Sequence, residues 1–162
     1  MTQITIPNLD LYRPRSYQLP FWQAFDSGKY QFLYAVWSRR SGKDVTFWNL
    51  ICREAVEKKG IYYYTYPTYE QSRKAIWEGI TTEGVKFIDF IPPEVIKKKL
   101  DNEMKIEFKN GSILRMVGTD KIDGLRGTNP RGCVFSEYAY QSPMAWQVIR
   151  PILSSSGKQH IP

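Results

Sequence analysis

Residues 31–59 restrict the possible fold more than any other part of the chain. "QFLYAVW", residues 31–37, is aromatic and β-branched, which predicts a buried strand. "SRRSGKD" follows directly, and residues 44–59 then carry apolar side chains at helical spacing before Gly60, which suits a helix stop. A strand, a Gly-Lys loop and a helix in this order are typical of a phosphate-binding loop.

The loop departs from the usual phosphate-binding pattern at two positions. That pattern is GxxxxGK followed by Ser or Thr, whose hydroxyl binds a magnesium ion. Gly42 and Lys43 are in place, but Trp37 replaces the first glycine and Asp44 replaces the hydroxyl residue. In the functional interpretation, backbone N–H groups and the helix N-terminus bind phosphates, and Lys43 pairs their charge. The alternative is a basic turn that enters a helix.

The remainder of the chain alternates strands with helices, which predicts an α/β fold with a mainly parallel sheet. We expect strands at 61–67 and 132–136, helices from about 69 to 80 (N-cap Thr68) and at 142–153 (N-cap Ser142), and a hairpin around Asn110-Gly111. Ligands of parallel sheets bind at the carboxyl ends of the strands. The Gly-Lys loop and Glu137 are therefore expected to meet at one edge of the sheet.

Glu137 follows the predicted strand 132–136 directly. A carboxylate beside a phosphate site can orient and polarise a water molecule for attack on a γ-phosphate. The alternative is a solvated glutamate after a strand. Its convergence with the Gly-Lys loop favours the catalytic interpretation.

Composition and charge narrow the classes of partner. The chain has 162 residues, 42% of them hydrophobic, and a net charge of +7 (23 basic minus 16 acidic residues), which favours polyanions as partners. No apolar run approaches the roughly 20 residues that span a bilayer, and the N-terminus carries no export signal. Cys52 and Cys133 have no metal or disulfide spacing, which suits a reducing cytoplasm, and His160 is the only histidine.

Four stretches, taken in order, resemble one known family. They are "YRPRSYQLPFWQAF", "SRRSGKD", "YTYPTYEQSRKAIW" and "NGSILRMVGTDKIDGLRGTNPRGCVFSEYA". Together they cover about residues 12–153 and resemble the N-terminal ATPase domain of the large terminase subunit, the DNA-packaging motor of tailed bacteriophages. The resemblance implies a RecA-like P-loop NTPase fold of the additional-strand type, as a single domain over residues 1–162.

The resemblance also implies roles for individual residues. Lys43 would bind the β- and γ-phosphates, Arg39 would reach the γ-phosphate from the same subunit, and Glu137 would be the catalytic carboxylate. Tyr17 and Gln18 would contact the adenine. The implied ATP-binding set is Tyr17, Gln18, Ser38, Arg39, Arg40, Ser41, Gly42, Lys43 and Asp44.

Arg126, in "GLRG", matches the place where some family members present an arginine to a neighbour's site. An arginine delivered in trans contributes about 10³- to 10⁵-fold to rate in other NTPases. The alternative is a turn residue in a glycine-flanked loop.

Asp44 and Ser136 exchange the residue types that the family pattern has. Family members carry Thr or Ser after the loop lysine and Asp before the catalytic glutamate, whereas here the carboxylate is at 44 and the hydroxyl at 136. If both side chains face one Mg²⁺, its ligands remain hard oxygen donors, one of them anionic. The rival hypothesis is that Asp44 repels the triphosphate and that Ser136 cannot secure the metal.

The resemblance implies ATP, Mg²⁺ and double-stranded DNA as ligands. The implied partners are the portal protein, the small terminase subunit and further copies in a ring, docked on the procapsid in the host cytoplasm. Two alternatives remain open: a non-catalytic prophage fragment, and another P-loop enzyme such as a helicase-like protein or a nucleotide kinase.

The chain stops at "SSSGKQHIP", before the strand that in this family lies between the phosphate-loop strand and the acidic strand, and before the nuclease domain. We therefore expect a truncated domain without nuclease activity. In it, the strands at 31–37 and 132–136 either pair directly or have another segment or chain between them.

Two further stretches have weaker readings. "KKK", residues 97–99, is either a solvated helix face or a contact with DNA phosphates. The tyrosines of "YYYTYPTY" are interpreted as strand packing.

Overall fold

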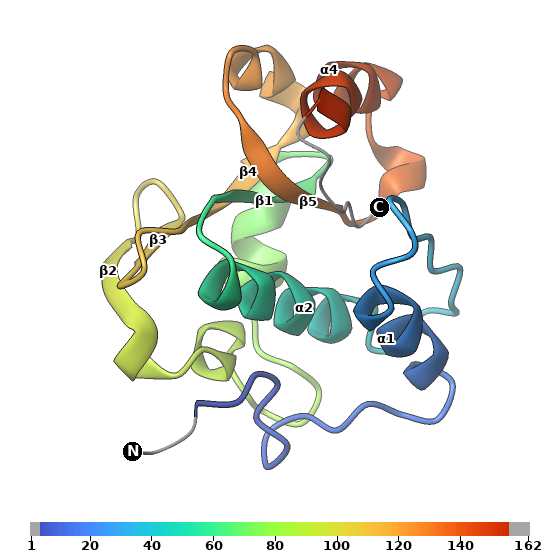
Figure 1. Ribbon diagram of the computed structural model, residues 1–162, viewed down its shortest axis with the longest axis vertical. Helices are drawn as coiled ribbons and strands as arrows, with labels where there is room; N and C mark the ends of the chain where they lie inside the picture. The colour runs from blue at the N-terminus through green and yellow to red at the C-terminus, as the bar shows by residue number, and fades with distance from the viewer. Residues whose placement is uncertain (1–3, 156–162) are drawn as a thin grey trace.

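The computed structural model describes residues 4–155, which form a five-stranded sheet with helices on both faces (Figure 1). The strands are β1 (Ile61–Tyr66), β2 (Ile96–Leu100), β3 (Lys105–Phe108), β4 (Ile113–Gly118) and β5 (Pro130–Phe135). The α-helices are α1 (Leu19–Asp26), α2 (Lys43–Glu57), α3 (Tyr69–Ser72) and α4 (Pro143–Ser155). Short helical turns are the π-helix η1 (Arg73–Trp77) and the 3-10 helices η2 (Phe87–Phe90), η3 (Pro93–Val95), η4 (Thr119–Leu125) and η5 (Tyr138–Tyr140).

The strand order in the sheet is β2-β3-β4-β1-β5. The central strand β1 runs parallel to β4 on one side and to β5 on the other. β3 and β4 form the antiparallel hairpin predicted at Asn110-Gly111, and β2 extends it. The carboxyl ends of β1 and β5 therefore lie at the same edge of the sheet, as the sequence predicts.

Most of the predicted helices are confirmed. α2 ends at Glu57, close to the expected stop. The helix after β1 begins at Tyr69 with the Thr68 hydroxyl accepting a hydrogen bond from the backbone N–H of Gln71, and it continues as η1. At the start of α4, Ser142 Oγ accepts a hydrogen bond from the backbone N–H of Met144.

The strand predicted at 31–37 is not formed. Phe32 takes part in a single β-bridge, and residues 33–38 are irregular. A strand needs a neighbour to accept its backbone hydrogen bonds, and no other described strand pairs with β5 on the side away from β1. Val36 is accordingly 95% exposed.

Direct pairing of this segment with β5, the first of the two expected arrangements, does not occur. A cavity of about 280 Å³ lies between residues 34–37 and residues 135–139. The second arrangement, in which another segment or chain lies between the two, stays a prediction.

The helical interpretation of residues 97–99 is also wrong, because these lysines lie in the edge strand β2. Lys98 is opposite Glu107 of β3. The Lys99 ammonium lies 5.1 Å from the centre of the Trp77 ring and 2.8 Å from Asp101. Charged side chains on an edge strand also oppose pairing with another chain.

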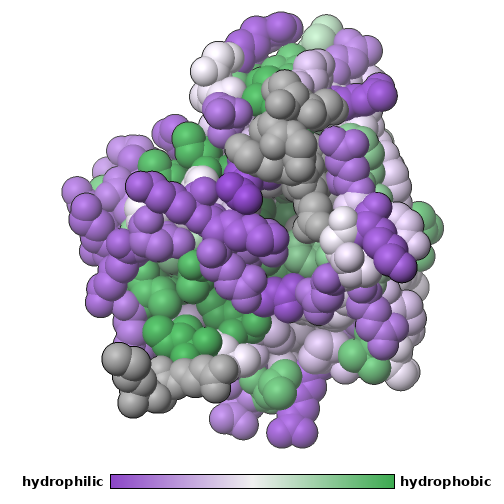
Figure 2. Space-filling view, viewed as in Figure 1, coloured by the Kyte–Doolittle hydropathy of each residue, from purple (hydrophilic) through white to green (hydrophobic). Residues whose placement is uncertain are grey.

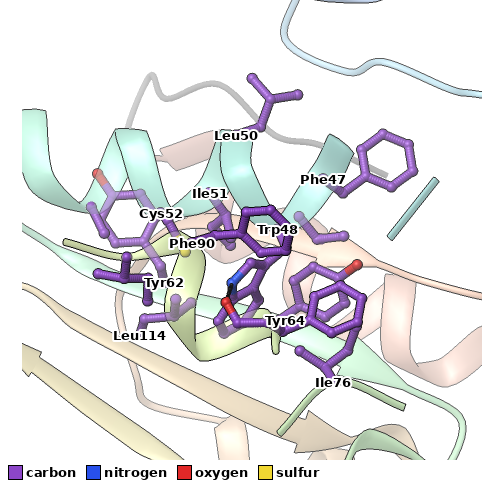
Figure 3. Packing of buried hydrophobic residues seen from close by; sticks show 14 of the residues in the cluster. Phe47, Trp48, Leu50, Ile51, Cys52, Tyr62, Tyr64, Ile76, Phe90 and Leu114 are labelled. Carbon is purple, nitrogen blue, oxygen red and sulfur yellow. Dashed lines mark hydrogen bonds between the residues drawn. The ribbon is translucent and has the colours of Figure 1, made fainter. Parts of the chain in front are cut away.

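Two hydrophobic cores hold the layers together. The larger core lies between α2 and one face of the sheet and includes Trp48, Tyr62 and Leu114 (Figure 3). The smaller core lies under α4 on the opposite face and contains Tyr63 and Phe135. Because side chains alternate along a strand, β1 supplies Tyr62, Tyr64 and Tyr66 to the first core and Tyr63 to the second.

α1 is fixed to α2 by Arg53, whose guanidinium pairs with Asp26 and lies 5.0 Å from the centre of the Trp22 ring.

Both cysteines are buried and free. Within residues 4–155, no helix is long and apolar enough to cross a membrane. The face of the molecule in Figure 2 is largely hydrophilic.

Candidate functional site

A cavity of about 580 Å³ is built around the Gly-Lys loop. The loop and the first turn of α2 supply residues 39–45 to its wall, and Glu137 lies on the same wall. The N-terminal segment contributes Leu11, Tyr12, Arg13, Arg15 and Gln18, and the segment after η1 contributes Ile80, Thr81, Thr82, Glu83, Phe87 and Phe90. Charged and polar groups therefore share the cavity with apolar side chains, as in pockets that bind small molecules and cofactors.

The loop takes a conformation that glycine permits. Gly42, the N-cap of α2, has φ +76°, and Arg40 also lies in the left-handed region at φ +59°. A Cβ atom at residue 42 would lie 2.9 Å from Nε2 of Gln18. Gly42 is thus required both by its backbone angle and by the close side chain of Gln18.

Gln18 and Tyr17, just before α1, hold the loop by hydrogen bonds to its backbone. Gln18 Nε2 and the Tyr17 hydroxyl both donate to the backbone carbonyl of Ser41, each at 2.7 Å. Gln18 Oε1 accepts from the hydroxyl of Tyr12 and from the backbone N–H of Arg15, each at 2.9 Å. The polar atoms of Gln18 are therefore used within the protein.

The adenine contacts expected of Tyr17 and Gln18 stay predictions. Gln18 lines the cavity, but Tyr17 does not: its ring packs edge-on against Trp37 at 5.8 Å. Their visible role is to position the loop. Tyr12, which also hydrogen-bonds Thr46 of α2 at 2.8 Å, ties the same segment to the helix.

Trp37 fixes the start of the loop where the usual pattern has glycine. Its ring stacks on Phe47 of α2 at 6.0 Å with an interplanar angle of 9°. Phe21 of α1 packs edge-on against the same ring at 5.8 Å. The backbone carbonyl of Trp37 accepts a hydrogen bond from Nζ of Lys43 at 3.2 Å.

Asp44 and Ser136 face each other, as the exchange hypothesis requires. Ser136 Oγ donates to Oδ1 of Asp44 at 2.6 Å. The hydroxyl of Tyr64 donates to the same oxygen at 2.7 Å, and the hydroxyl of Tyr66 donates to Oδ2 at 2.8 Å. Burial, and then the negative charge of Asp44, raise the pKa of both tyrosines, so both hydroxyls remain protonated donors.

This donor set fits a magnesium ion that is shared with phosphates. Asp44 lines the large cavity and Ser136 lines the smaller one, with the Ser136 Oγ atom 2.6 Å from Oδ1 of Asp44. Glu137, the residue after Ser136, lines both cavities. Among the described residues, no group of three or more His, Cys, Asp or Glu side chains could hold a metal by itself. Mg²⁺ commonly uses one or two carboxylates together with substrate phosphates and water, so such a group is not needed.

Ser41 adds an unsatisfied polar group to the loop. Its Oγ atom is buried and has no hydrogen-bond partner in the described structure. Buried hydroxyls are normally paired. A bound phosphate would offer this one an acceptor.

Glu137 is held in a strained conformation beside the loop. Its φ of +53° lies in the left-handed region, which is rare for residues other than glycine and occurs often at functional sites. The side chain is exposed and lines both cavities. Gln141 Nε2 donates to the backbone carbonyls of Ser136 and Thr65, at 2.5 and 3.3 Å, and so fixes the turn that carries Glu137.

The other predicted residues lie in different surroundings. Arg39 and Arg40 are exposed and line the large cavity, whereas Ser38 is exposed and does not. Arg126 lies outside both cavities, where its Nε donates to Asp123 at 2.8 Å. An arginine placed away from its own site is what a role in trans requires, and that role stays a prediction.

Sequence reasoning missed two parts of the site. It did not identify the wall formed by residues 80–83 with Phe87 and Phe90, because no local pattern there indicates a ligand. It read Tyr64 and Tyr66 as packing residues only. Their alternation with Tyr62 did place all three on one face of β1, but the contact with Asp44 depends on how α2 lies across that face.

The fold is similar to that of the ATPase domain of the large terminase from Thermus phage P74-26. The similarity has a TM-score of 0.71 at 19% sequence identity and covers 98% of this chain and 69% of that one. A point mutant of the same domain superposes with a TM-score of 0.73 at 18% identity, covering 97% of this chain and 69% of that one. The chain therefore has the fold of a terminase ATPase domain, a RecA-like P-loop fold. No protein-family model and no curated protein sequence matches it.

Proposed function

We propose that this chain is the ATP-binding and ATP-hydrolysing part of a terminase-type motor that drives DNA packaging. The observation that carries the proposal is that the Gly-Lys loop, Asp44 and Glu137 line one cavity in this fold, and that Ser136 is hydrogen-bonded to Asp44 beside it. These features come from two distant parts of the sequence, residues 38–44 and residues 136–137, and groups of these kinds have complementary roles in phosphoryl transfer.

Binding begins at the loop. The N-terminus of α2 and the loop backbone offer N–H groups and a positive dipole to the phosphates. The Lys43 ammonium, which is bonded to the Trp37 carbonyl, turns to the phosphate oxygens. Asp44 and Ser136 would hold a magnesium ion, which would offset part of the phosphate charge.

Hydrolysis uses water as the nucleophile. Glu137 orients the water and accepts its proton, while Lys43 and Arg39 stabilise the charge on the transferring phosphoryl group. In a ring of copies, Arg126 of one subunit reaches the site of the next. DNA, the portal protein and the small terminase subunit are the partners of the assembled motor.

A second candidate function is nucleotide binding without turnover. It is favoured by the irregular conformation of residues 33–38, where P-loop enzymes have a strand immediately before the loop. Under this alternative the chain binds ATP but releases no phosphate. Measuring both binding and turnover separates the two functions.

Titration of the purified chain with ATP, with Mg²⁺ and then in EDTA, tests the proposal. Lys43→Ala should weaken Mg²⁺-dependent ATP binding about 10-fold or more, because a charge-assisted bond to phosphate is lost. Lys74→Ala, at an exposed lysine of η1, is the matched control and should bind as the wild type does. Equal affinities for wild type and Lys43→Ala would contradict the proposal.

A further inference from the structure

We propose that Tyr64 and Tyr66 are positioning residues of the metal–nucleotide site, because their hydroxyls hold the Asp44 carboxylate in the orientation in which it meets the magnesium ion. This inference rests on the proposed function. It assigns a role to two core tyrosines whose rings otherwise only pack.

Three elements converge on this one carboxylate. Asp44 is in the first turn of α2, Tyr64 and Tyr66 are on β1, and Ser136 follows β5. Their three hydroxyls reach Asp44 at 2.6–2.8 Å. Both carboxylate oxygens are engaged, so the side chain cannot rotate without breaking a hydrogen bond.

The three hydrogen bonds to the Asp44 carboxylate leave one of its lone-pair positions free for a metal ion. An ionised carboxylate offers about four lone-pair positions. Oδ1 accepts two hydrogen bonds, from Tyr64 and Ser136, and Oδ2 accepts one, from Tyr66. One position on Oδ2 therefore remains available, which suits a carboxylate that binds Mg²⁺ through a single oxygen.

Tyr62 shows what a purely structural tyrosine does on the same strand face. Its hydroxyl donates to the backbone carbonyls of Lys58 and Glu54, at 2.6 and 3.1 Å, near the other end of α2. Tyr64 is equally buried, and its ring stacks near that of Tyr66 with centres 6.2 Å apart. The difference is that these two hydroxyls bind a side chain that lines the nucleotide cavity.

The same hydrogen bonds reduce the electrostatic repulsion between the Asp44 carboxylate and the bound phosphates. A carboxylate near a triphosphate is repelled by the like charge, and more strongly in a drier site than in water. Three donated hydrogen bonds offset part of the Asp44 charge in the cavity. The hydroxyls thus hold the one anionic group that distinguishes this loop from the usual pattern.

The test compares Tyr62→Phe, Tyr64→Phe and Tyr66→Phe in the full chain. Each variant removes one buried hydroxyl from the same face of β1. The readout is the ratio of the ATP dissociation constant in EDTA to that in Mg²⁺, measured by titration, with the melting temperature recorded for each variant. Loss of a group that orients a metal ligand typically lowers metal affinity about 10- to 100-fold. We expect the ratio to fall at least about 10-fold in Tyr66→Phe and Tyr64→Phe and to stay at the wild-type value in Tyr62→Phe.

Each result decides the inference. If Tyr66→Phe lowers the melting temperature as Tyr62→Phe does but leaves the ratio unchanged, the hydroxyls are structural and the inference is wrong while the proposed function stands. If the wild type itself shows no effect of Mg²⁺ on ATP binding, the proposed magnesium site fails and the inference falls with it. If Tyr64→Phe does not fold, Tyr66→Phe carries the same decision alone.

Discussion

Ser136 and Asp44 are 92 positions apart in the sequence, yet Oγ of the first donates a 2.6 Å hydrogen bond to Oδ1 of the second. This contact joins the turn after β5 to the first turn of α2, at the edge of the sheet where the cavity opens. The family pattern has the hydroxyl after the loop lysine and the carboxylate before the catalytic glutamate. In this chain the two groups have exchanged positions, and they are still neighbours in space.

Because the two side chains are in contact, reversing the exchange should preserve the site. We expect Asp44→Thr and Ser136→Asp each to weaken Mg²⁺-dependent ATP binding, and the double variant Asp44→Thr/Ser136→Asp to recover most of the loss. The interaction energy of such a contacting pair is typically about 0.5–3 kcal/mol, which a double-mutant cycle of ATP titrations can resolve. A double variant that binds no better than the weaker single variant would disprove the shared-metal hypothesis.

Gly42→Ala should destabilise the loop more than the left-handed backbone conformation of residue 42 alone would explain. Its φ is +76°, and the new Cβ would lie 2.9 Å from Nε2 of Gln18, which braces the loop. Gly127→Ala is the matched control, since its φ is +81° and no atom lies within 4 Å of the new Cβ. Both variants should lose about 1–2 kcal/mol of unfolding free energy from backbone strain, and Gly42→Ala should lose more. Only Gly42→Ala should lose ATP affinity. Equal effects of the two substitutions on stability and on binding would contradict the account.

Glu137→Gln separates binding from turnover. The side chain is exposed on the cavity wall, so the amide should leave ATP affinity near the wild-type value. Phosphate release should fall about 10²- to 10⁴-fold, because the amide cannot accept the proton of the attacking water. Steady-state phosphate release from the assembled protein measures this. Glu103→Gln, at a glutamate that pairs with Lys105 outside the cavity, should release phosphate at the wild-type rate. Undiminished turnover in Glu137→Gln would exclude it as the base.

Alkaline pH should destabilise the chain through its buried tyrosines. Burial raises the pKa of Tyr64 and Tyr66 above the ordinary value of 10.0, so the folded state holds these protons more tightly than the unfolded state does. Their contribution to stability is then fully present below pH 10 and is lost as pH rises above it. Each such tyrosine adds a slope of about 1.4 kcal/mol per pH unit in that range. Urea unfolding of wild type and Tyr66→Phe between pH 9 and 11 should show the smaller slope in the variant. Identical slopes would contradict the prediction.

Several parts of the fold are predictable because their signals are local. The apolar spacing along α2, the Asn110-Gly111 turn and the Thr68 cap each depend on residues close together in the chain, and each is confirmed. The meeting of Glu137 with the loop is also predictable, since parallel strands bring their carboxyl ends to one edge.

The failures concern features that depend on distant partners. Residues 31–37 have strand composition, but a strand forms only beside another strand. β2 lacks the usual strand composition, because "IKKKL" has lysines where strands favour β-branched residues, and it is held by pairing with β3. Tyr64 and Tyr66 reach Asp44 only because α2 crosses the sheet at that point. No periodicity in the sequence encodes that crossing.

The most direct measurement for the central claim is a crystal structure of the chain with Mg²⁺ and a non-hydrolysable ATP analogue. We predict the triphosphate in the 580 Å³ cavity against the loop, with Lys43 turned from the Trp37 carbonyl to the phosphates and the ion bound by Asp44 or Ser136. A nucleotide bound elsewhere, or an ion that touches neither Asp44 nor Ser136, would contradict the account.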